Sequence, residues 1–487
     1  MGLTASAGEI NICRLLAAIS RHCRFALDSI GGFDDDAARR RRHRDNHENP
    51  GMSRRIFFDG LNLALERGTG IATYTRMLAA LVHEAGDEVG LVYSSPRRPL
   101  RDRDRRELDF LGPRRAGRLV SKTRAHWNDV IDQIHCVCGL RPQPVQSPEP
   151  GIAERLSANL PAHDHLFVAR NLFGNASRYF GWSGRFAELD FAVRPDILHC
   201  TYPMPLRARG ARNVYTIHDL IPLRLPHTTL DNKRQIYRLL RGTAATADHI
   251  VTVSEHSRRD IIELLGVDEN RVTNTYEAVE FPREQVERPD DDVAAELDSL
   301  YRLQAKSYLL FFGAIEPKKN VKALLEAYLL SAVDVPLVIV GGGGWGNQAE
   351  TRMLEEIEAQ ERAQPPEKRR VRQFDYASRS ALVSLIKGAR AVLFPSLFEG
   401  FGLPVLEAMM LGTPVVTSRT SSLPEIAGEA ALYVDPYDTD DIARAIKTIT
   451  ADTDLRAELS RRGLAQAELF SVARYRQRVA ALYDRLV

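Results

Sequence analysis

Two glutamates, Glu399 and Glu407, are separated by seven residues that form an apolar stretch rich in glycine. Each could simply be a solvated charge that complements the dipole at the start of a helix. A loop that faces solvent is usually polar, however. The apolar character of the stretch between the glutamates therefore favours a functional site.

The elements that position these glutamates are predicted to be a strand, a sharp loop and a helix. The apolar run 391–394 has the length of a strand that is covered on both faces. Gly400 and Gly402 allow a tight turn and a close approach to a ligand, and Pro404 suits the first turn of a helix. The first glutamate is then expected at the carboxyl end of a strand and the second in the opening turn of the helix. Open α/β sheets bind their ligands at this edge, and a helix start offers N–H groups to an anion.

Two lysines, Lys318 and Lys319, lie at another predicted junction, between a strand at 308–313 and a helix at 321–330. The helix start supplies N–H groups and the lysines supply positive charge, a combination that suits a diphosphate. The alternative is a pair of solvated lysines.

His218 and Asp219 end a third predicted strand, at 213–219. A histidine in this position can reach a cleft, and Asp219 could hold the orientation of its imidazole. The alternative is a histidine hydrogen-bonded to its own loop.

Gly68 and Gly70 lie between a predicted strand at 55–60 and a predicted helix at 71–84. A strand, a glycine loop and a helix start together can accommodate phosphate. The alternative is an ordinary turn between a strand and a helix.

Composition narrows the class of protein. The chain has 487 residues and a net charge of +2, so nothing in its charge demands nucleic acid. Its 5 cysteines are sparse, which predicts a reducing compartment, the cytoplasm. No apolar run is long enough to span a membrane. The basic block 39–44 is of a kind that is usually solvated; the alternative is contact with acidic phospholipids at the inner face of the plasma membrane.

The string from Phe398 to Pro404, followed by Glu407-Ala408-Met409, resembles the Glu-x7-Glu signature of retaining, nucleotide-sugar-dependent glycosyltransferases of family four. The resemblance runs from about Arg54 to the C-terminus, with a poorly matched stretch between about Pro96 and Arg194. It implies the GT-B fold. The alternation of strands and helices in both halves independently predicts two doubly wound parallel sheets, each Rossmann-like.

The resemblance also implies a division of the chain. The expected parts are an N-terminal extension that is disordered (1–52), with Met52 as a plausible true start; an acceptor-side domain (53–303) with an insert at about 95–194; a nucleotide-sugar-binding domain (304–469); and a C-terminal helix that crosses back to the first domain (470–487). Within these parts, 281–303 is interpreted as the linker between the domains, and 141–144 and 147–151 as a loop or linker.

Site roles follow from the resemblance, residue by residue. Glu399 faces the donor sugar, Glu407 accepts hydrogen bonds from the ribose hydroxyls, and His218 contacts the transferred sugar. The lysines offset charge on the leaving diphosphate, so no metal or cofactor is expected. The catalytic set is then Glu399, His218 and Lys319; the donor-binding set is Gly68, Gly70, Lys318, Lys319, Phe374, Glu399, Gly400, Phe401, Gly402, Leu403 and Glu407. Phe374 could equally be a core residue.

The partners implied are a nucleotide diphosphate hexose, with GDP-mannose as a candidate, and a glycan or lipid-linked glycan acceptor. The segments 57–60, 68–71 and 313–317 most resemble bacterial enzymes that build surface polysaccharides. Two other functions stay open: an enzyme of the same fold that epimerises or hydrolyses nucleotide sugars, and a non-catalytic partner protein that kept the fold.

Overall fold

The computed structural model describes residues 53–64, 70–95, 131–145, 160–229, 232–344, 348–365 and 368–487. These residues group into two compact units. The first contains residues up to 215 together with 241–248, and the second contains 216–240 and 249–486. The extension 1–52, its basic block and Gly68 lie outside the described residues.

The first unit is built on a parallel sheet with β1 (Arg55–Asp59) near its middle. β1 pairs with β2 (Glu88–Ser95) on one side and with β6 (Ile197–Cys200) on the other. β2 continues to β4 (His165–Arg170), and β6 continues to β8 (Arg212–Thr216). The last four residues of β1 are buried, as a strand covered on both faces requires. The other elements of this unit include α3 (Gly70–Glu84), α7 (Leu172–Ser183), β5 (Ala187–Leu189) and β7 (Leu206–Ala208).

The interpretation of 141–144 as a loop or linker is wrong for 143–144, and 147–151 lies outside the described residues. Residues 143–145 form β3 (Gln143–Val145), which pairs antiparallel with β4. Pro144 is exposed there and Val145 is buried. A proline is tolerated at such a place because β3 is an edge strand and its partner supplies the other side of the ladder.

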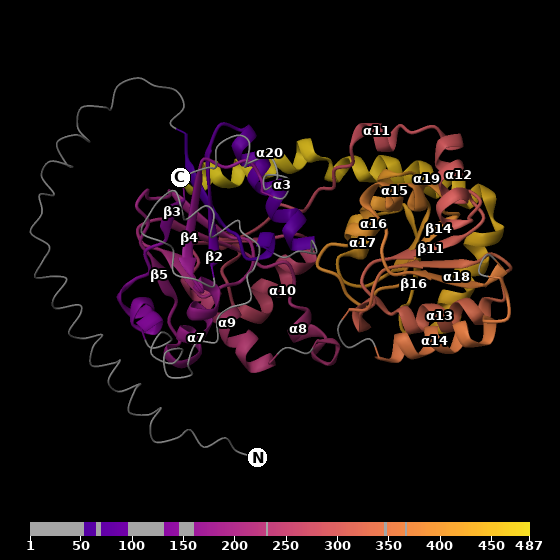
Figure 1. Ribbon diagram of the computed structural model, residues 1–487, viewed down its shortest axis with the longest axis horizontal. Helices are drawn as coiled ribbons and strands as arrows, with labels where there is room; N and C mark the ends of the chain where they lie inside the picture. The colour runs from indigo at the N-terminus through magenta and orange to yellow at the C-terminus, as the bar shows by residue number, and fades with distance from the viewer. Residues whose placement is uncertain are drawn as a thin grey trace, which may run out of the picture. The chain divides into compact units, whose positions relative to one another are not determined.

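The second unit contains a six-stranded parallel sheet in the order β13-β12-β11-β14-β15-β16. Its strands are β11 (Leu309–Phe312), β12 (Leu337–Val340), β13 (Val371–Phe374), β14 (Ala391–Phe394), β15 (Val415–Ser418) and β16 (Ala431–Val434). One face of the sheet is covered by α13 (Val321–Ser331), α14 (Gln348–Glu361) and α18 (Thr439–Ala451) (Figure 1). The other face is covered by α12 (Asp290–Tyr301), α15 (Arg379–Gly388) and α19 (Thr453–Ala467). Strands enclosed by two helical layers explain the short apolar runs of the sequence.

The interpretation of 281–303 as a linker is also wrong. This segment forms α11 (Arg283–Val286) and α12, and α12 buries Val293 and Leu297. Pro289 stands at the N-cap of α12, and three aspartates follow it in the first turn. Prolines and acidic charge at this end are compatible with a helix, so a composition that looks like a linker belongs here to a helix start.

The second unit also contains β9 (His249–Thr252), β10 (Val272–Asn274) and α10 (Glu255–Leu265). The Ser254 side chain caps α10 by accepting a hydrogen bond from the N–H of Ser257. The terminal helix α20 (Val472–Leu486) reaches the same region, since Arg485 donates to Thr273 Oγ1 over 2.6 Å. Thr273 falls in the range 53–303 that was expected to form the acceptor-side domain.

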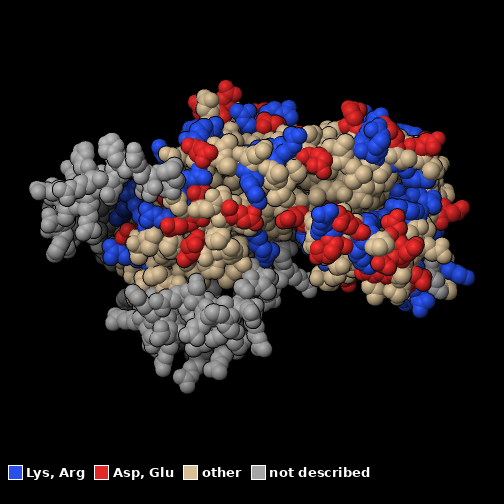
Figure 2. All heavy atoms as spheres, turned by 90° about the horizontal axis from the view of Figure 1, so that it is seen from above, with Lys and Arg blue, Asp and Glu red and all other residues tan. Residues whose placement is uncertain are grey.

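Acidic and basic side chains are interspersed on the face that Figure 2 shows, in keeping with the small net charge. Among the described residues, no helix has both the length and the apolar character needed to cross a membrane.

Candidate active site

The Glu399 carboxylate lies in the loop that leaves the carboxyl end of β14. Its side chain is only 8% exposed. Lys319 Nζ lies 2.6 Å from Glu399 Oε1, and the Ser396 hydroxyl donates to the same oxygen over 2.6 Å. The backbone N–H of Glu399 donates to Ser421 Oγ over 2.9 Å. The predicted lysine and glutamate therefore form one buried, hydrogen-bonded group.

Backbone contacts bring the two segments together. The N–H of Leu397 donates to the Lys318 carbonyl over 2.8 Å, and the Asn320 amide donates to the Pro395 carbonyl over 3.1 Å. Asn320 adopts a left-handed conformation with φ of 59°, which turns the chain from the lysine segment into α13. Lys319 Nζ also lies 4.7 Å from the centre of the Phe394 ring. The lysines are thus held at the carboxyl ends of β11 and β14, which pair directly.

The electrostatics of the group keep it ionised. Burial alone would raise the pKa of Glu399, but Lys319 and Lys318 outweigh that cost and lower the pKa. Burial alone would lower the pKa of Lys318, but Glu399, Asp219 and Glu316 raise it. Lys318 Nζ also lies 4.0 Å from Glu316 Oε2, so the carboxylates around the two ammonium groups hold both lysines in their charged form.

His218 joins the same group through the backbone. Its Nδ1 lies 3.1 Å from Glu277 Oε1, and since a carboxylate only accepts, this contact places the proton on Nδ1. The Ser257 hydroxyl lies 2.9 Å from the His218 carbonyl and 3.3 Å from the Gly400 carbonyl. A Cβ atom at Gly400 would come within 2.7 Å of the His218 carbonyl oxygen. Glycine at position 400 is therefore required by the close approach of these two loops.

The suggestion that Asp219 orients His218 is wrong. Asp219 Oδ1 instead accepts from the N–H of Ile221 over 3.0 Å, a local turn that starts α8 (Ile221–Arg224). The carboxylate that holds the imidazole is Glu277, three residues after β10. The parallel pairing of β9 and β10 places the ends of both strands at one edge, so recognising the short strand 272–274 would have revealed Glu277.

Glu407 lies in the second turn of α16 (Leu403–Met410), one turn later than expected. The side chain is half-buried, and its carboxylate accepts no hydrogen bond from any residue that the structure describes. Burial raises the pKa of Glu407 to about 7, against the opposing effect of Arg379 and Lys319. An acceptor with both oxygens unused suits a ligand that donates two hydrogen bonds.

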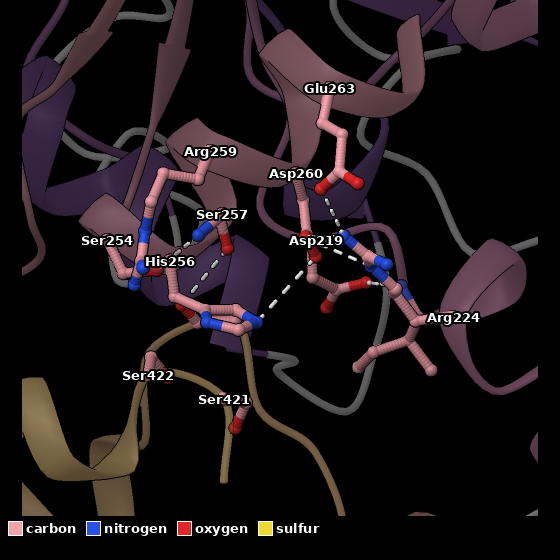
Figure 3. Close-up of polar contacts among 12 residues, drawn as sticks. Asp219, Arg224, Ser254, His256, Ser257, Arg259, Asp260, Glu263, Ser421 and Ser422 are labelled. Carbon is pink, nitrogen blue, oxygen red and sulfur yellow. Dashed lines mark hydrogen bonds and ion pairs between the residues drawn. The ribbon is translucent and has the colours of Figure 1, made fainter.

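A second polar cluster, formed by Arg224, His256 and Asp260, contacts the loop that carries Phe398 (Figure 3). The His256 ring packs edge-on against Phe398, with ring centres 5.2 Å apart, and its Nε2 lies 3.7 Å from Asp260 Oδ2. Asp260 Oδ1 accepts from Arg224 over 2.6 Å. The backbone N–H of His256 donates to Glu425 Oε2 over 3.1 Å. Burial lowers the pKa of His256, so its imidazole is neutral near pH 7.

The remaining residues of the predicted donor-binding set lie in different parts of the structure. Gly402 has φ of 112°, as its place before α16 requires. The Phe401 side chain packs against Phe470, with ring centres 5.6 Å apart, and is buried in an aromatic cluster. Phe374 stacks edge-on against Tyr301 at 5.0 Å on the outermost strand β13. Gly70 begins α3 in the first unit. Leu403, at the start of α16, is half-buried.

Ser396 is a site residue that sequence reasoning did not single out. The cue was its place directly between β14 and the glycine loop. No group of three or more histidine, cysteine, aspartate or glutamate side chains in the described part of the chain could hold a metal ion.

Two α/β units, each with a parallel sheet, and a charged site at the carboxyl ends of the second sheet define the GT-B class. The crystal structure of Anabaena HepE in complex with UDP and glucose has the same fold. It has a TM-score of 0.60 and 15% sequence identity, and the match covers 89% of this chain and 100% of that one.

Family models match both units. The model described as Glycosyltransferase Family 4 matches residues 132–280, and the model described as Glycosyl transferases group 1 matches residues 298–466. The O-antigen chain mannosyltransferase B of Escherichia coli is 34% identical over 268 residues, which cover 54% of this chain and 68% of that protein. The chain therefore belongs to the glycosyltransferases of group 1 and family 4.

A longer relative is matched over only part of its length. The serotype-specific mannosyltransferase WbdA of Escherichia coli is 29% identical over 268 residues, which cover 54% of this chain and 32% of the relative. The chain thus spans about a third of that protein. The comparisons support a glycosyltransferase of polysaccharide synthesis.

Proposed function

We propose that this protein transfers a mannose residue from a nucleotide diphosphate mannose to a glycan or lipid-linked glycan acceptor, with retention of configuration at the anomeric carbon. The observation that carries the proposal is the buried group formed by Lys319, Glu399 and Ser396 at the carboxyl end of β14. GDP-mannose is the proposed donor because the O-antigen relatives are named as mannosyltransferases.

The lysines would stabilise the leaving group. As the bond from the anomeric carbon to the phosphate oxygen breaks, negative charge grows on the diphosphate. Lys318 and Lys319 supply positive charge there without a metal. A charge-assisted hydrogen bond of this kind contributes roughly 1.5–3 kcal/mol. Lys319→Ala should therefore weaken both donor and free nucleotide diphosphate binding, and unchanged affinity for the diphosphate would exclude the role.

The glutamates would act on the two sugars of the donor. The buried, ionised Glu399 would face the ring where positive charge develops, and Glu407 would accept hydrogen bonds from the ribose hydroxyls. His218, with its proton fixed on Nδ1 by Glu277, would present Nε2 toward the transferred sugar.

The chemical step would use the donor's own phosphate as the base. The new bond joins the acceptor oxygen to the anomeric carbon on the face that the diphosphate leaves. The proton of the acceptor hydroxyl passes to the departing phosphate oxygen. The step therefore balances without a covalent nucleophile from the protein.

The decisive experiment is incubation of the full chain with GDP-mannose or UDP-glucose, with and without a mannose-containing oligosaccharide acceptor. We expect GDP release that depends on the acceptor, and an α-linked product by nuclear magnetic resonance. GDP release without any acceptor would identify a hydrolase. A β-linked product would exclude retention, and failure of every nucleotide sugar to bind would leave a non-catalytic protein.

A further inference from the structure

A cavity of about 570 Å³ lies within the first unit. Its walls come from the segment 136–138, the end of α7 with the loop 184–186 that follows it, β5, β7 and the end of α9 (Lys233–Thr246); Figure 1 labels β5, α7 and α9. None of its lining residues belongs to the site formed by His218, Lys319 and Glu399. The volume falls in the range of small-molecule sites, roughly 300–1,000 Å³.

The cavity carries an excess of positive charge. Arg185, Arg207 and Arg209 line it together with one acidic side chain, Glu188. Three positive charges and one negative charge leave an excess of two. The Arg185 guanidinium is exposed and has no hydrogen bond or ion pair with any residue that the structure describes.

Two of the arginines are fixed in place. Glu188 on β5 lies opposite Arg207 on β7 in the strand pairing, and Arg207 and Arg209 point to the same side because they are two residues apart. Arg209 Nη2 donates to Glu188 Oε2 over 2.8 Å, and Arg207 donates to the other carboxylate oxygen. These arginines bond Glu188 through Nε and Nη2, which leaves the Nη1 group of each for a ligand.

Apart from the charged side chains, the wall includes two aromatic residues. The Phe186 ring lines the cavity, and Tyr179 lies beside it. Burial alone would raise the pKa of Glu188, but its bonds from Arg207 and Arg209 lower the pKa, so the carboxylate stays ionised and keeps both guanidiniums in position. Prearranged guanidiniums beside aromatic rings suit an anion attached to an apolar or ring-shaped body.

We propose that this cavity binds a phosphate-bearing ligand at a site distinct from the one that the transfer reaction uses. The phosphate oxygens take hydrogen bonds from Arg185 and from the Nη1 groups of Arg207 and Arg209. Phosphate of this kind occurs on soluble sugar phosphates and on the head groups of anionic lipids. The experiment separates these two sources.

Cys138 provides a local probe because it is half-buried in the wall of the same cavity. The neighbouring Cys136 is buried, and burial raises the pKa of its thiol to about 12, so it reacts slowly at neutral pH. The rate of alkylation of Cys138 by iodoacetamide, followed by mass spectrometry of the labelled peptide, therefore reports occupancy of this cavity and not of the transferase site.

The rate is measured on the full chain with inorganic pyrophosphate, with mannose 1-phosphate, and with vesicles of phosphatidylcholine that contain or lack phosphatidylglycerol. We expect at least one phosphate source to slow alkylation severalfold. Protection by the soluble phosphates alone assigns a soluble ligand. Protection by vesicles only when they contain phosphatidylglycerol assigns a lipid head group. No protection by any source overturns the proposal.

Matched variants exclude general charge effects. Arg185→Gln removes a charge that has no partner among the described residues, and Ala245→Glu adds a negative charge to the wall of the cavity. Either should raise the ligand concentration needed for half-protection about tenfold, the effect of roughly 1.4 kcal/mol. Arg212→Gln alters an exposed arginine outside the cavity and should change nothing. The proposal would be overturned if Arg185→Gln and Ala245→Glu were protected at the same ligand concentration as the unaltered protein. It would also be overturned if Arg212→Gln lost protection to a similar degree.

A further variant separates this proposal from the proposed function. Lys319→Ala should retain full protection of Cys138 even if it binds no nucleotide diphosphate. Loss of protection in Lys319→Ala would mean that the anion acts from the transferase site and would refute a separate cavity site.

Discussion

Removing either partner of the Lys319–Glu399 ion pair should destabilise the protein. The two side chains are 12% and 8% exposed, and their charged atoms are 2.6 Å apart. Breaking a buried pair by removing one charge costs about 3–5 kcal/mol, since the other charge stays buried without compensation. Glu399→Gln should lie at the upper end of this range, because it leaves Lys319 without its carboxylate and removes one of the carboxylates that act on Lys318.

Lys319→Met should lower the free energy of unfolding by less than Glu399→Gln does. After this change, Glu399 keeps the Ser396 hydroxyl and the nearby charge of Lys318. The double variant removes both charges of the pair and should lose less stability than the two single losses combined. We expect a coupling energy of about 2–3 kcal/mol, near the top of the range for residues in contact.

Urea unfolding followed by circular dichroism gives the change in the free energy of unfolding for the two single variants and the double variant. Arg283 and Glu287 supply a matched control, because their charged atoms are 2.7 Å apart but the side chains are 85% and 59% exposed. An exposed helix pair should show a coupling of only about 0.3–0.5 kcal/mol. A coupling energy for Lys319 and Glu399 no larger than that of the control would show that burial does not strengthen this ion pair, and would refute the buried, hydrogen-bonded site.

Four further predictions concern the site and the N-terminal extension. Glu399→Gln should lower kcat with donor affinity nearly unchanged, whereas Glu407→Gln should mainly raise the donor KM; steady-state kinetics with separately measured affinities decides this, and exchanged effects would reverse the roles. The pKa of Glu407 is raised to about 7 in the folded protein, whereas in the unfolded chain this carboxyl loses its proton above about pH 4.5. The contribution of Glu407 to the free energy of unfolding therefore falls as the pH rises from about 4.5 to about 7. Glu407→Gln should remove that fall in urea unfolding at a series of pH values, and an unchanged profile would contradict the raised pKa. Glu277→Gln should lower kcat and alter its pH profile by releasing the His218 ring, while thermal unfolding changes little; an unchanged profile would show that Glu277 does not set the state of the imidazole. Deletion of residues 1–51 should leave folding and activity intact, and loss of either on truncation would show that the extension packs on the body.

The sequence revealed most of the second sheet because buried parallel strands are short apolar runs, as in 309–312 and 391–394. It also placed Lys319 and Glu399 after two such strands, but the 2.6 Å contact between them came only from the structure. It failed where composition misleads: Pro289 with three aspartates resembled a linker but begins α12. It missed Glu277 because β10 has only three residues, too few for a periodic pattern. The choice between Asp219 and Glu277 required three-dimensional contacts.

The close contact among His218, Ser257 and Gly400 has a consequence for the time at which the site can form. The Ser257 hydroxyl bridges carbonyls that belong to distant parts of the chain, and Ser257 and Gly400 are 143 positions apart. During synthesis at roughly 5–20 residues per second, about 7–29 s separate the appearance of these two residues. The segment that contains His218 and Ser257 is therefore synthesised well before the loop that contains Glu399 and Gly400. Until Gly400 arrives, the Ser257 hydroxyl can bond only the His218 carbonyl, and the nascent chain lacks the loop that completes the candidate site.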